Sequence, residues 1–394
     1  MTIEHWLLPD GVEDILPEPA AKLEQARRVC LDLFKRWGYQ YVIPPKLEFL
    51  ESLLTGTGQD LDLKTFKVID QLTGRMMGLP ADLTPQTARI DAHSLGRSAV
   101  TRLCYADFVL QSRPDHMLAS RTPLKVGAEL FGEPELSGDV EMISLLMETL
   151  NALGLEGVQL ELGDVSIFRC LLGQANLNQD QQSEIFSLVQ RKSHDALAEK
   201  VREQELPPML AGLICELPRL SGDAAILDTA AALVKDWPQI AMAIDNLAEL
   251  SGAIKQRFPN VQLSFDLSEL RGFEYHTGVV FSVFLPDSGQ TVAKGGRYDN
   301  IGAVFGRARA ATGFDIELLS VSDQISETPA AKVVHCDSGS TMNIVEKWSA
   351  IAALRSQGYI VVEGSAEQNQ GSHVWPGWMV PGIFNRLSRI HESG

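Results

Sequence analysis

Arg271-Gly-Phe-Glu-Tyr-His-Thr-Gly-Val-Val-Phe-Ser-Val-Phe284 is the most informative run of residues in this chain. Alternate positions from Phe273 to Val283 are aromatic or β-branched, and this period of two predicts a β-strand. Tyr275 and His276 would then face opposite sides of the strand. Arg271 stands beside a glycine, where its guanidinium could hold a carboxylate through a fork of N–H donors. The alternative is a buried strand in which Arg271 makes a structural ion pair.

The composition excludes some classes of protein. With 394 residues, of which 45% are hydrophobic, the chain can bury a large core and form two domains. Its formal net charge is -17. Because neutralisation of phosphates dominates nucleic-acid affinity, such an acidic chain is poorly suited to binding tRNA or DNA. We therefore expect no nucleic-acid partner.

The cysteines and the N-terminal residues indicate the compartment. The five cysteines are scattered and are not spaced like metal ligands, which indicates reduced thiols and no metal site. The first residues form neither a basic segment nor an apolar one, and no apolar run is long enough to span a bilayer. We expect a cytoplasmic protein without membrane attachment.

The pattern along the chain indicates an α+β fold. Helices are predicted at about 19–37, with an apolar stripe from Leu23 to Trp37 that ends at Gly38, and at about 138–153. Many segments between them alternate like antiparallel strands. Their approximate ranges are 39–43, 66–69, 75–79, 102–110, 125–131, 158–162, a segment from 261 and 292–299. Strands with helices segregated around them favour α+β over a doubly wound sheet.

Two domains are expected. Residues 1–325 form the main domain, and a helical insertion at about 165–257 interrupts it, because strand patterns almost vanish there. A linker follows at 326–329. Residues 330–394 then form a small C-terminal α/β domain, in which two strand patterns flank a helix at about 342–357.

Several segments, in their order along the chain, resemble histidyl-tRNA synthetase. They are the Pro9 to Pro17 lead-in, Asp82-Leu-Thr-Pro85, Val126-Gly-Ala-Glu-Leu-Phe-Gly132, Arg271-Gly-Phe-Glu-Tyr-His-Thr-Gly278 and Gly295-Gly-Arg-Tyr-Asp299. The resemblance covers about residues 5–320. It implies the fold of class II aminoacyl-tRNA synthetases, which is an antiparallel sheet flanked by helices. It also implies a homodimer formed through elements near Pro44 and Pro45.

The chain departs from the synthetases at two ATP-binding positions. Gln111 stands where the family has an arginine that binds the ATP α-phosphate, and Ser320 stands where it has a second ATP-binding arginine. Adenylation develops charge on phosphorus between polyanionic groups, so the site needs fixed cations. Loss of one such stabilising group costs roughly 10²–10³ in rate. We therefore expect no catalytic residues.

A chain that keeps the histidine pocket but lacks the ATP-binding arginines is similar to the regulatory subunits of ATP phosphoribosyltransferase. Leu83-Thr-Pro-Gln-Thr-Ala-Arg89 and the short C-terminal unit also fit that family. The resemblance implies a non-catalytic subunit that activates the short-form catalytic subunit in the first step of histidine biosynthesis. It further implies a homodimer within a hetero-octamer, histidine as the inhibitory effector and no cofactor. The alternatives are an active synthetase-like enzyme and a stand-alone histidine sensor.

The resemblance also implies roles for pocket residues. Arg271 would bind the carboxylate of histidine, and Asp82, Thr84 and Glu129 would surround its α-ammonium group. An alternative role for Asp82 or Thr84 is to cap the helix that follows.

Three further residues belong to the same implied pocket. Tyr275 and His276 would lie near the imidazole ring. Lys125 replaces a glutamine of the family beside the ammonium site, where a second cation is unfavourable. The alternative for Lys125 is an ion pair with Glu129 along the same strand face.

Overall fold

The computed structural model describes residues 6–54, 59–114, 119–286, 289–326, 333–336 and 343–363. The chain divides into two compact units, Met1–Ser326 and Glu327–Gly394. Of the predicted linker, only Ser326 lies among the described residues, and the C-terminal segment from 364 onward lies outside them. Among the described residues, no helix has the length and apolar character needed to cross a membrane.

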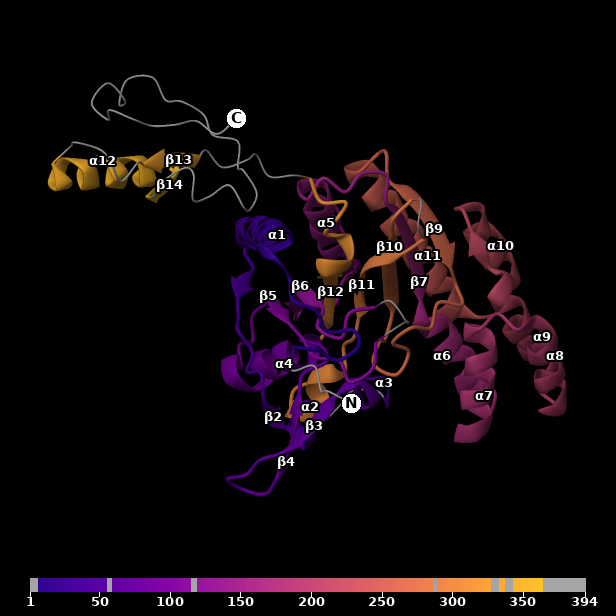
Figure 1. Cartoon of the computed structure of the whole chain (residues 1–394). Helices are drawn as coiled ribbons and strands as arrows, with labels where there is room; N and C mark the ends of the chain where they lie inside the picture. The colour runs from indigo at the N-terminus through magenta and orange to yellow at the C-terminus, as the bar shows by residue number, and fades with distance from the viewer. Residues whose placement is uncertain are drawn as a thin grey trace. The chain divides into compact units, whose positions relative to one another are not determined.

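A nine-stranded sheet forms the centre of the first unit (Figure 1). Its order is β1 (Gln40–Tyr41), β5 (Thr101–Phe108), β6 (Leu124–Phe131), β12 (Ala311–Glu317), β11 (Thr291–Arg297), β10 (Val279–Phe284), β7 (Gln159–Asp164), β9 (Gln262–Asp266) and β8 (Ser221–Gly222). The pairs β1–β5 and β7–β9 are parallel, and the others are antiparallel. The α+β prediction, with a largely antiparallel sheet, is confirmed.

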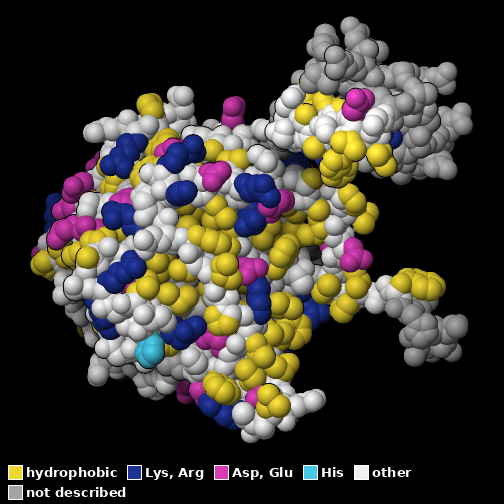
Figure 2. All heavy atoms as spheres, turned by 90° about the vertical axis from the view of Figure 1, so that its left-hand side faces the viewer, with side chains coloured by type: hydrophobic (Ala, Val, Ile, Leu, Met, Phe, Trp, Pro, Cys, Tyr) yellow, Lys and Arg dark blue, Asp and Glu magenta, His cyan; other side chains and the backbone are white. Residues whose placement is uncertain are grey.

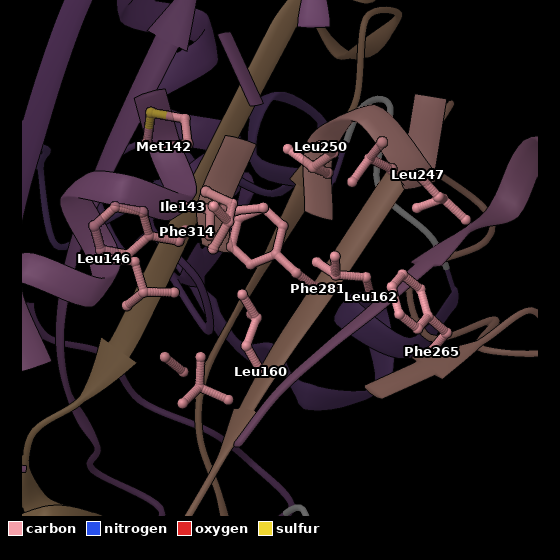
Figure 3. Close-up of a cluster of buried hydrophobic side chains, with 14 of the residues drawn as sticks. Met142, Ile143, Leu146, Leu160, Leu162, Leu247, Leu250, Phe265, Phe281 and Phe314 are labelled. Atoms are coloured by element: carbon pink, nitrogen blue, oxygen red, sulfur yellow. The ribbon is translucent and has the colours of Figure 1, made fainter. Parts of the chain in front are cut away.

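Long helices cover one face of this sheet. They are α1 (Pro17–Arg36), α5 (Leu136–Ala152) and α11 (Pro238–Arg257). Leu160, Leu162, Phe281 and Phe314 from the strands pack with Ile143 and Leu247 from the helices, and all are buried (Figure 3). This layer is the main hydrophobic core, and burial of its apolar surface contributes most of the stability.

Helix α1 shows how local sequence produces one of these elements. Its apolar residues recur at intervals of three or four, so Leu23, Cys30 and Phe34 lie on one buried stripe. The Phe34 ring packs edge-on against Phe314 of the sheet, with centroids 5.9 Å apart. Gly38 follows the helix with a φ of +85°, a backbone conformation that favours glycine.

The opposite face of the sheet is polar. In β6, Val126, Ala128 and Leu130 point into the core, so Lys125 and Glu129 point to the other side. In β12, Phe314 and Ile316 are core residues, which places Asp315 on the same polar face as Lys125. The period of two therefore brings these charged side chains together above the middle of the sheet.

Further elements close this polar side. A three-stranded sheet has the order β2 (Glu48–Phe49), β4 (Met76–Leu79) and β3 (Phe66–Ile69), and it includes the strands predicted at 66–69 and 75–79. Short helices α2 (Leu50–Leu54), α3 (Gln59–Lys64) and α4 (Thr84–Arg89) accompany it. Helix α4 continues into a π-helical turn, Ile90–Leu95. Single turns of 3-10 helix occur at Ile301–Phe305 and Leu319–Val321.

Helices dominate residues 165–257. They are α6 (Val165–Gln174), α7 (Gln179–Gln190), α8 (His194–Glu203), α9 (Pro208–Glu216), a 3-10 turn Leu217–Arg219, α10 (Ala225–Leu233) and α11. Side chains of the Asp164 and Asn178 caps accept the N–H groups of Ser166 and Gln181 and so begin α6 and α7. Strand β8 is the short extended segment within this part of the chain.

The second unit contains one βαβ element. Strands β13 (Val333–Cys336) and β14 (Ile360–Glu363) are parallel, and α12 (Ile344–Ser356) connects them. Ile351, Leu354 and Val361 form its small core. The Asn343 side chain accepts the N–H of Val345 and begins the helix.

The prediction of one continuous strand from 271 to 284 is wrong in its first half. Strand β10 begins only at Val279. Gly272 has a φ of +68°, and its carbonyl accepts the N–H groups of both Tyr275 and His276. The chain therefore forms a tight turn where the alternating pattern predicts extended backbone, because these local hydrogen bonds replace strand pairing.

Candidate ligand-binding site

Glu129 lies at the centre of the polar face and is 1% exposed. Its carboxylate accepts hydrogen bonds from the hydroxyls of Thr84 at 2.9 Å and Tyr105 at 3.1 Å, and from the hydroxyl of Tyr298. Burial raises the pKa of Glu129 to about 8, although these hydroxyl donors lower it. Glu129 is thus a buried carboxyl group that keeps its proton at pH 7 and loses it near pH 8.

Lys125 forms a second cluster beside Glu129. Its Nζ lies 3.0 Å from Asp82 Oδ2 and 3.1 Å from Asp315 Oδ1. Burial opposes the charge of Lys125, but the Asp315 and Asp82 carboxylates raise its pKa above the ordinary value. The alternative of a Lys125–Glu129 ion pair is therefore wrong. Lys125 pairs instead across strands with Asp315, and Asp315 escaped sequence reasoning because no local spacing links it to Lys125.

Asp82 and Thr84 reach the cluster from the start of α4. Asp82 Oδ1 accepts the backbone N–H of Thr84 at 2.9 Å, so Asp82 does stabilise the entry into this helix. The alternative of Thr84 as a side-chain cap is wrong, since its hydroxyl donates to Glu129 instead. Burial would raise the pKa of Asp82, but the Lys125 ammonium and the Thr84 N–H lower it well below its usual range.

Glycines leave room for these side chains. A Cβ at Gly313, which pairs with Glu129 in the sheet, would overlap the Glu129 carboxylate. A Cβ at Gly127 would meet the Tyr105 hydroxyl and the Phe314 carbonyl oxygen. The floor of the site therefore consists of backbone, and polar groups can approach it closely.

Tyr275 and His276 form one wall of the site together. Their ring centroids are 4.2 Å apart, so the prediction that they face opposite sides is wrong. Burial raises the pKa of Tyr275, and the nearby Asp82 and Asp315 carboxylates raise it further. Burial also lowers the pKa of His276 to about 4, so its imidazole is neutral at pH 7. Since His276 Nδ1 lies 3.3 Å from the Arg271 carbonyl oxygen, Nδ1 carries the proton and Nε2 is the acceptor.

A hollow of about 450 Å³ opens beside this wall. Its lining consists of Arg169, Glu274, Tyr275, His276, Thr277, Asn300 and Ile301. This volume is within the usual range of small-molecule pockets. The Arg169 guanidinium at its edge donates to the carbonyl oxygens of Phe273 and His276 and so holds the turn in place.

Arg271 does not join the site residues. Its guanidinium pairs with Glu269, with Nη2 to Oε2 at 2.7 Å, and its side chain is 51% exposed. The alternative for Arg271 was a structural ion pair within a buried strand; the structure has an ion pair, but on a turn and with the arginine half exposed. After the turn at Gly272, the Arg271 guanidinium lies beside Glu269 and over the Phe284 ring, 6.0 Å from its centroid.

Tyr298 is a site residue that sequence reasoning did not select. It is buried, and its hydroxyl donates to Glu129. The neighbouring Arg297 guanidinium bonds to Asp139 Oδ2 at 2.8 and 3.0 Å, which fixes the end of β11. Tyr298 is part of the Gly295–Asp299 motif, which could have pointed to it as a site residue. Nothing in that motif shows which carboxyl group the Tyr298 hydroxyl binds.

Comparison with known proteins identifies the family. A family model for histidyl-tRNA synthetase matches residues 11–321. The ATP phosphoribosyltransferase regulatory subunits of Teredinibacter turnerae and Saccharophagus degradans are 45% and 46% identical to this chain, over 93% of this chain and 93% of each relative. The chain belongs to the ATP phosphoribosyltransferase regulatory subunit family.

A solved structure agrees with the fold of this family. An ATP phosphoribosyltransferase regulatory subunit/histidyl-tRNA synthetase from Bacillus halodurans superimposes with a TM-score of 0.79 at 24% identity. The match covers 93% of this chain and 94% of that chain. The synthetase-like fold predicted from the motifs is therefore confirmed.

Neither Gln111 nor Ser320, at the two positions predicted to correspond to ATP-binding arginines, carries a cation. Gln111 is buried, and its amide donates to the Ala81 carbonyl at 3.3 Å. The Ser320 hydroxyl donates to the Glu317 carbonyl at 2.8 Å. Arg113, two residues beyond Gln111, is exposed. Among the described residues, no arginine bonds to Asp82, Glu129 or Asp315, and no group of side chains is arranged to hold a metal ion.

Proposed function

We propose that this chain is a non-catalytic subunit that activates the short-form catalytic subunit of ATP phosphoribosyltransferase and transmits inhibition by histidine. A single contrast carries the proposal. The site keeps a buried carboxyl group at Glu129 among three hydroxyls, whereas Gln111 and Ser320 occupy the positions predicted to bind ATP through arginines in a synthetase. Such a site is suited to binding a small polar ligand but lacks the fixed cations that adenylation needs.

The chemistry of the wall supports an imidazole as part of the ligand. Neutral His276 and the hydroxyl of Tyr275 offer hydrogen-bonding groups beside aromatic surface at the hollow. Histidine would inhibit by binding the less active state of the assembly more tightly than the active state. Asp82, Thr84, Glu129, Tyr275 and His276 are the proposed contacts. Arg271 would need to leave Glu269 in order to reach the ligand.

Reconstitution tests this function. The pure chain is mixed with a short-form catalytic subunit, and phosphoribosyl transfer from phosphoribosyl pyrophosphate to ATP is measured with and without histidine. We expect the rate to rise on mixing and to fall again when histidine is added. An unchanged rate on mixing would refute the role as an activator, and activation that histidine does not reduce would refute its role as the effector.

A second assay separates this role from that of a synthetase. Without the two arginines, ATP–pyrophosphate exchange dependent on histidine should be undetectable, since loss of each stabilising group costs roughly 10²–10³ in rate. An active histidyl-tRNA synthetase from any source serves as the positive control. Clear exchange by this chain would overturn the non-catalytic assignment.

We further propose that the chain forms a homodimer through the β1 edge of the sheet. Tyr41, Ile43 and Phe108 are exposed at this edge, and hydrophobic side chains form a broad patch on this face (Figure 2). A patch of this kind is typical of a protein interface. The dimer would assemble with catalytic chains into a hetero-octamer. The free thiols of Cys30, Cys104, Cys170 and Cys215 support a cytoplasmic location.

Substitution at the patch tests the dimer. Ile43→Asp, at a residue that is 72% exposed, should convert the dimer to a monomer in light scattering, because a charge would be buried in an apolar interface. Met242→Asp on α11 is the matched control, since Met242 is 61% exposed but lies in the helical insertion. A dimer that survives Ile43→Asp would place the interface elsewhere.

A further inference from the structure

Lys125 lies among the residues that the proposed function places around the ammonium group of the ligand. Its Nζ lies between Asp82 and Asp315, at 3.0 and 3.1 Å, and its side chain is 5% exposed. Asp82 is one of the carboxylates proposed to hold a ligand's α-ammonium. The chain therefore supplies internally a cation that a free amino acid would otherwise bring.

The acceptors around this position are already engaged. The second oxygen of Asp82 accepts the Thr84 N–H at 2.9 Å. The carboxylate of Glu129 accepts from three hydroxyls, those of Thr84, Tyr105 and Tyr298. A second ammonium would thus have to break existing contacts, and it would also be repelled by Lys125 at short range.

Lys125 is not easily displaced or neutralised. It projects from β6, which lies inside the sheet between β5 and β12, so the strand holds its Cα in place. The two carboxylates raise its pKa, so it stays charged throughout the physiological pH range. Moving it away would leave Asp82 and Asp315 as unpaired carboxylates, which is costly for buried groups.

We propose that Lys125, held by Asp82 and Asp315, fills the ammonium subsite of the proposed histidine site and makes that site selective for the imidazole of a ligand rather than its α-amino group. Histidine then gains nothing from its ammonium and binds only at high concentration, so Lys125 sets the threshold for inhibition. This inference rests on the proposed function, because it concerns the same pocket.

A pair of ligands tests the proposal directly. Histidine is compared with imidazolepropionate, which is histidine without the α-amino group, by calorimetric titration of the full-length chain alone and assembled with the catalytic subunit. The parent protein should bind histidine no more tightly than imidazolepropionate. Lys125→Gln should shift the ratio of the two affinities toward histidine by about tenfold or more, because Asp82 and Asp315 become free to bind an ammonium.

Two further variants separate charge from structure. Lys125→Arg keeps the cation and should keep the ratio of the parent. Lys125→Gln combined with Asp315→Asn removes one charge of each sign. Asp82 is then free to bind an ammonium group, and fewer carboxylates are left unpaired than in Lys125→Gln alone. This double variant should shift the ratio as Lys125→Gln does, and it serves in place of the single variant if that one does not fold.

The outcomes distinguish this inference from the proposed function. If the ligands bind but the parent prefers histidine by about tenfold or more, or if removal of Lys125 leaves the ratio unchanged, the inference is wrong while the effector role stands. If neither ligand binds any of the folded proteins, histidine is not the effector and both ideas fail. A shift toward histidine in both lysine-free variants, absent in Lys125→Arg, supports the inference.

Discussion

Arg297→Ala is expected to lower the free energy of unfolding by about 3–5 kcal/mol, because it leaves a buried carboxylate without its partner. The Arg297 guanidinium donates to Asp139 Oδ2 at 2.8 and 3.0 Å and to the backbone carbonyls of Glu133 and Glu135 at 3.1 Å. The Asp139 side chain is 2% exposed. Burial already raises the pKa of Asp139 despite the opposing effect of Arg297. Urea unfolding monitored by circular dichroism measures the loss.

Arg219→Ala is the matched control for this loss. Arg219 pairs with Glu216 at a comparable distance, 3.1 Å, but the two side chains are 53% and 42% exposed. Exposed ion pairs contribute roughly 0–1 kcal/mol, so this variant should remain close to the parent. Similar small losses for both variants would show that the Arg297–Asp139 pair is not an important source of stability.

The second large effect is the pH dependence that Glu129 imposes on stability. Its carboxyl has an ordinary pKa of 4.5, and burial raises this to about 8 in the folded chain. The unfolded chain therefore loses this proton near pH 4.5, whereas the folded chain keeps it until about pH 8. Between these values the folded state binds more protons, so this contribution to stability falls as pH rises and becomes constant above pH 8.

Glu129→Gln removes this titration. Relative to the variant, the parent should lose on the order of 3 kcal/mol of unfolding free energy between about pH 5 and pH 8.5. Unfolding in urea at a series of pH values measures the difference. Glu156→Gln, at an exposed position, is the control and should follow the parent. Parallel curves for the parent and Glu129→Gln would show that Glu129 ionises at its ordinary pKa.

The sheet and its covering helices could be predicted from local patterns. The stripe of α1 and the alternation of β6 depend on residues close in sequence, and burial of one face is enough to specify each element. The turn at 271–278 could not be predicted in this way. The aromatic and β-branched residues there match a strand, but Gly272 allows a left-handed backbone and a set of local hydrogen bonds that compete with pairing.

The chemistry of the site also depends partly on the sequence alone and partly on the tertiary structure. The identity of Gln111 and Ser320 is a property of the sequence alone, and so is the presence of Glu129 and Lys125 within an apolar strand. The residues with which Glu129 and Lys125 pair are not determined by the sequence alone. Asp315 reaches Lys125 from the neighbouring strand β12, and Tyr298 reaches Glu129 from the residue that follows β11, so the order and register of strands far apart in the sequence select these pairs.

By itself, then, the sequence determined the fold class, the family and the absence of arginine at the two positions predicted to bind ATP, because these depend on residue type and short-range spacing. Tertiary structure alone decided that Lys125 binds Asp82 and Asp315, that Arg271 turns toward Glu269 and that Tyr275 lies against His276. The physical reason is that a charge pairs with the opposite charge that the fold brings nearest, and that distance is set by strand register and turn geometry rather than by separation along the chain.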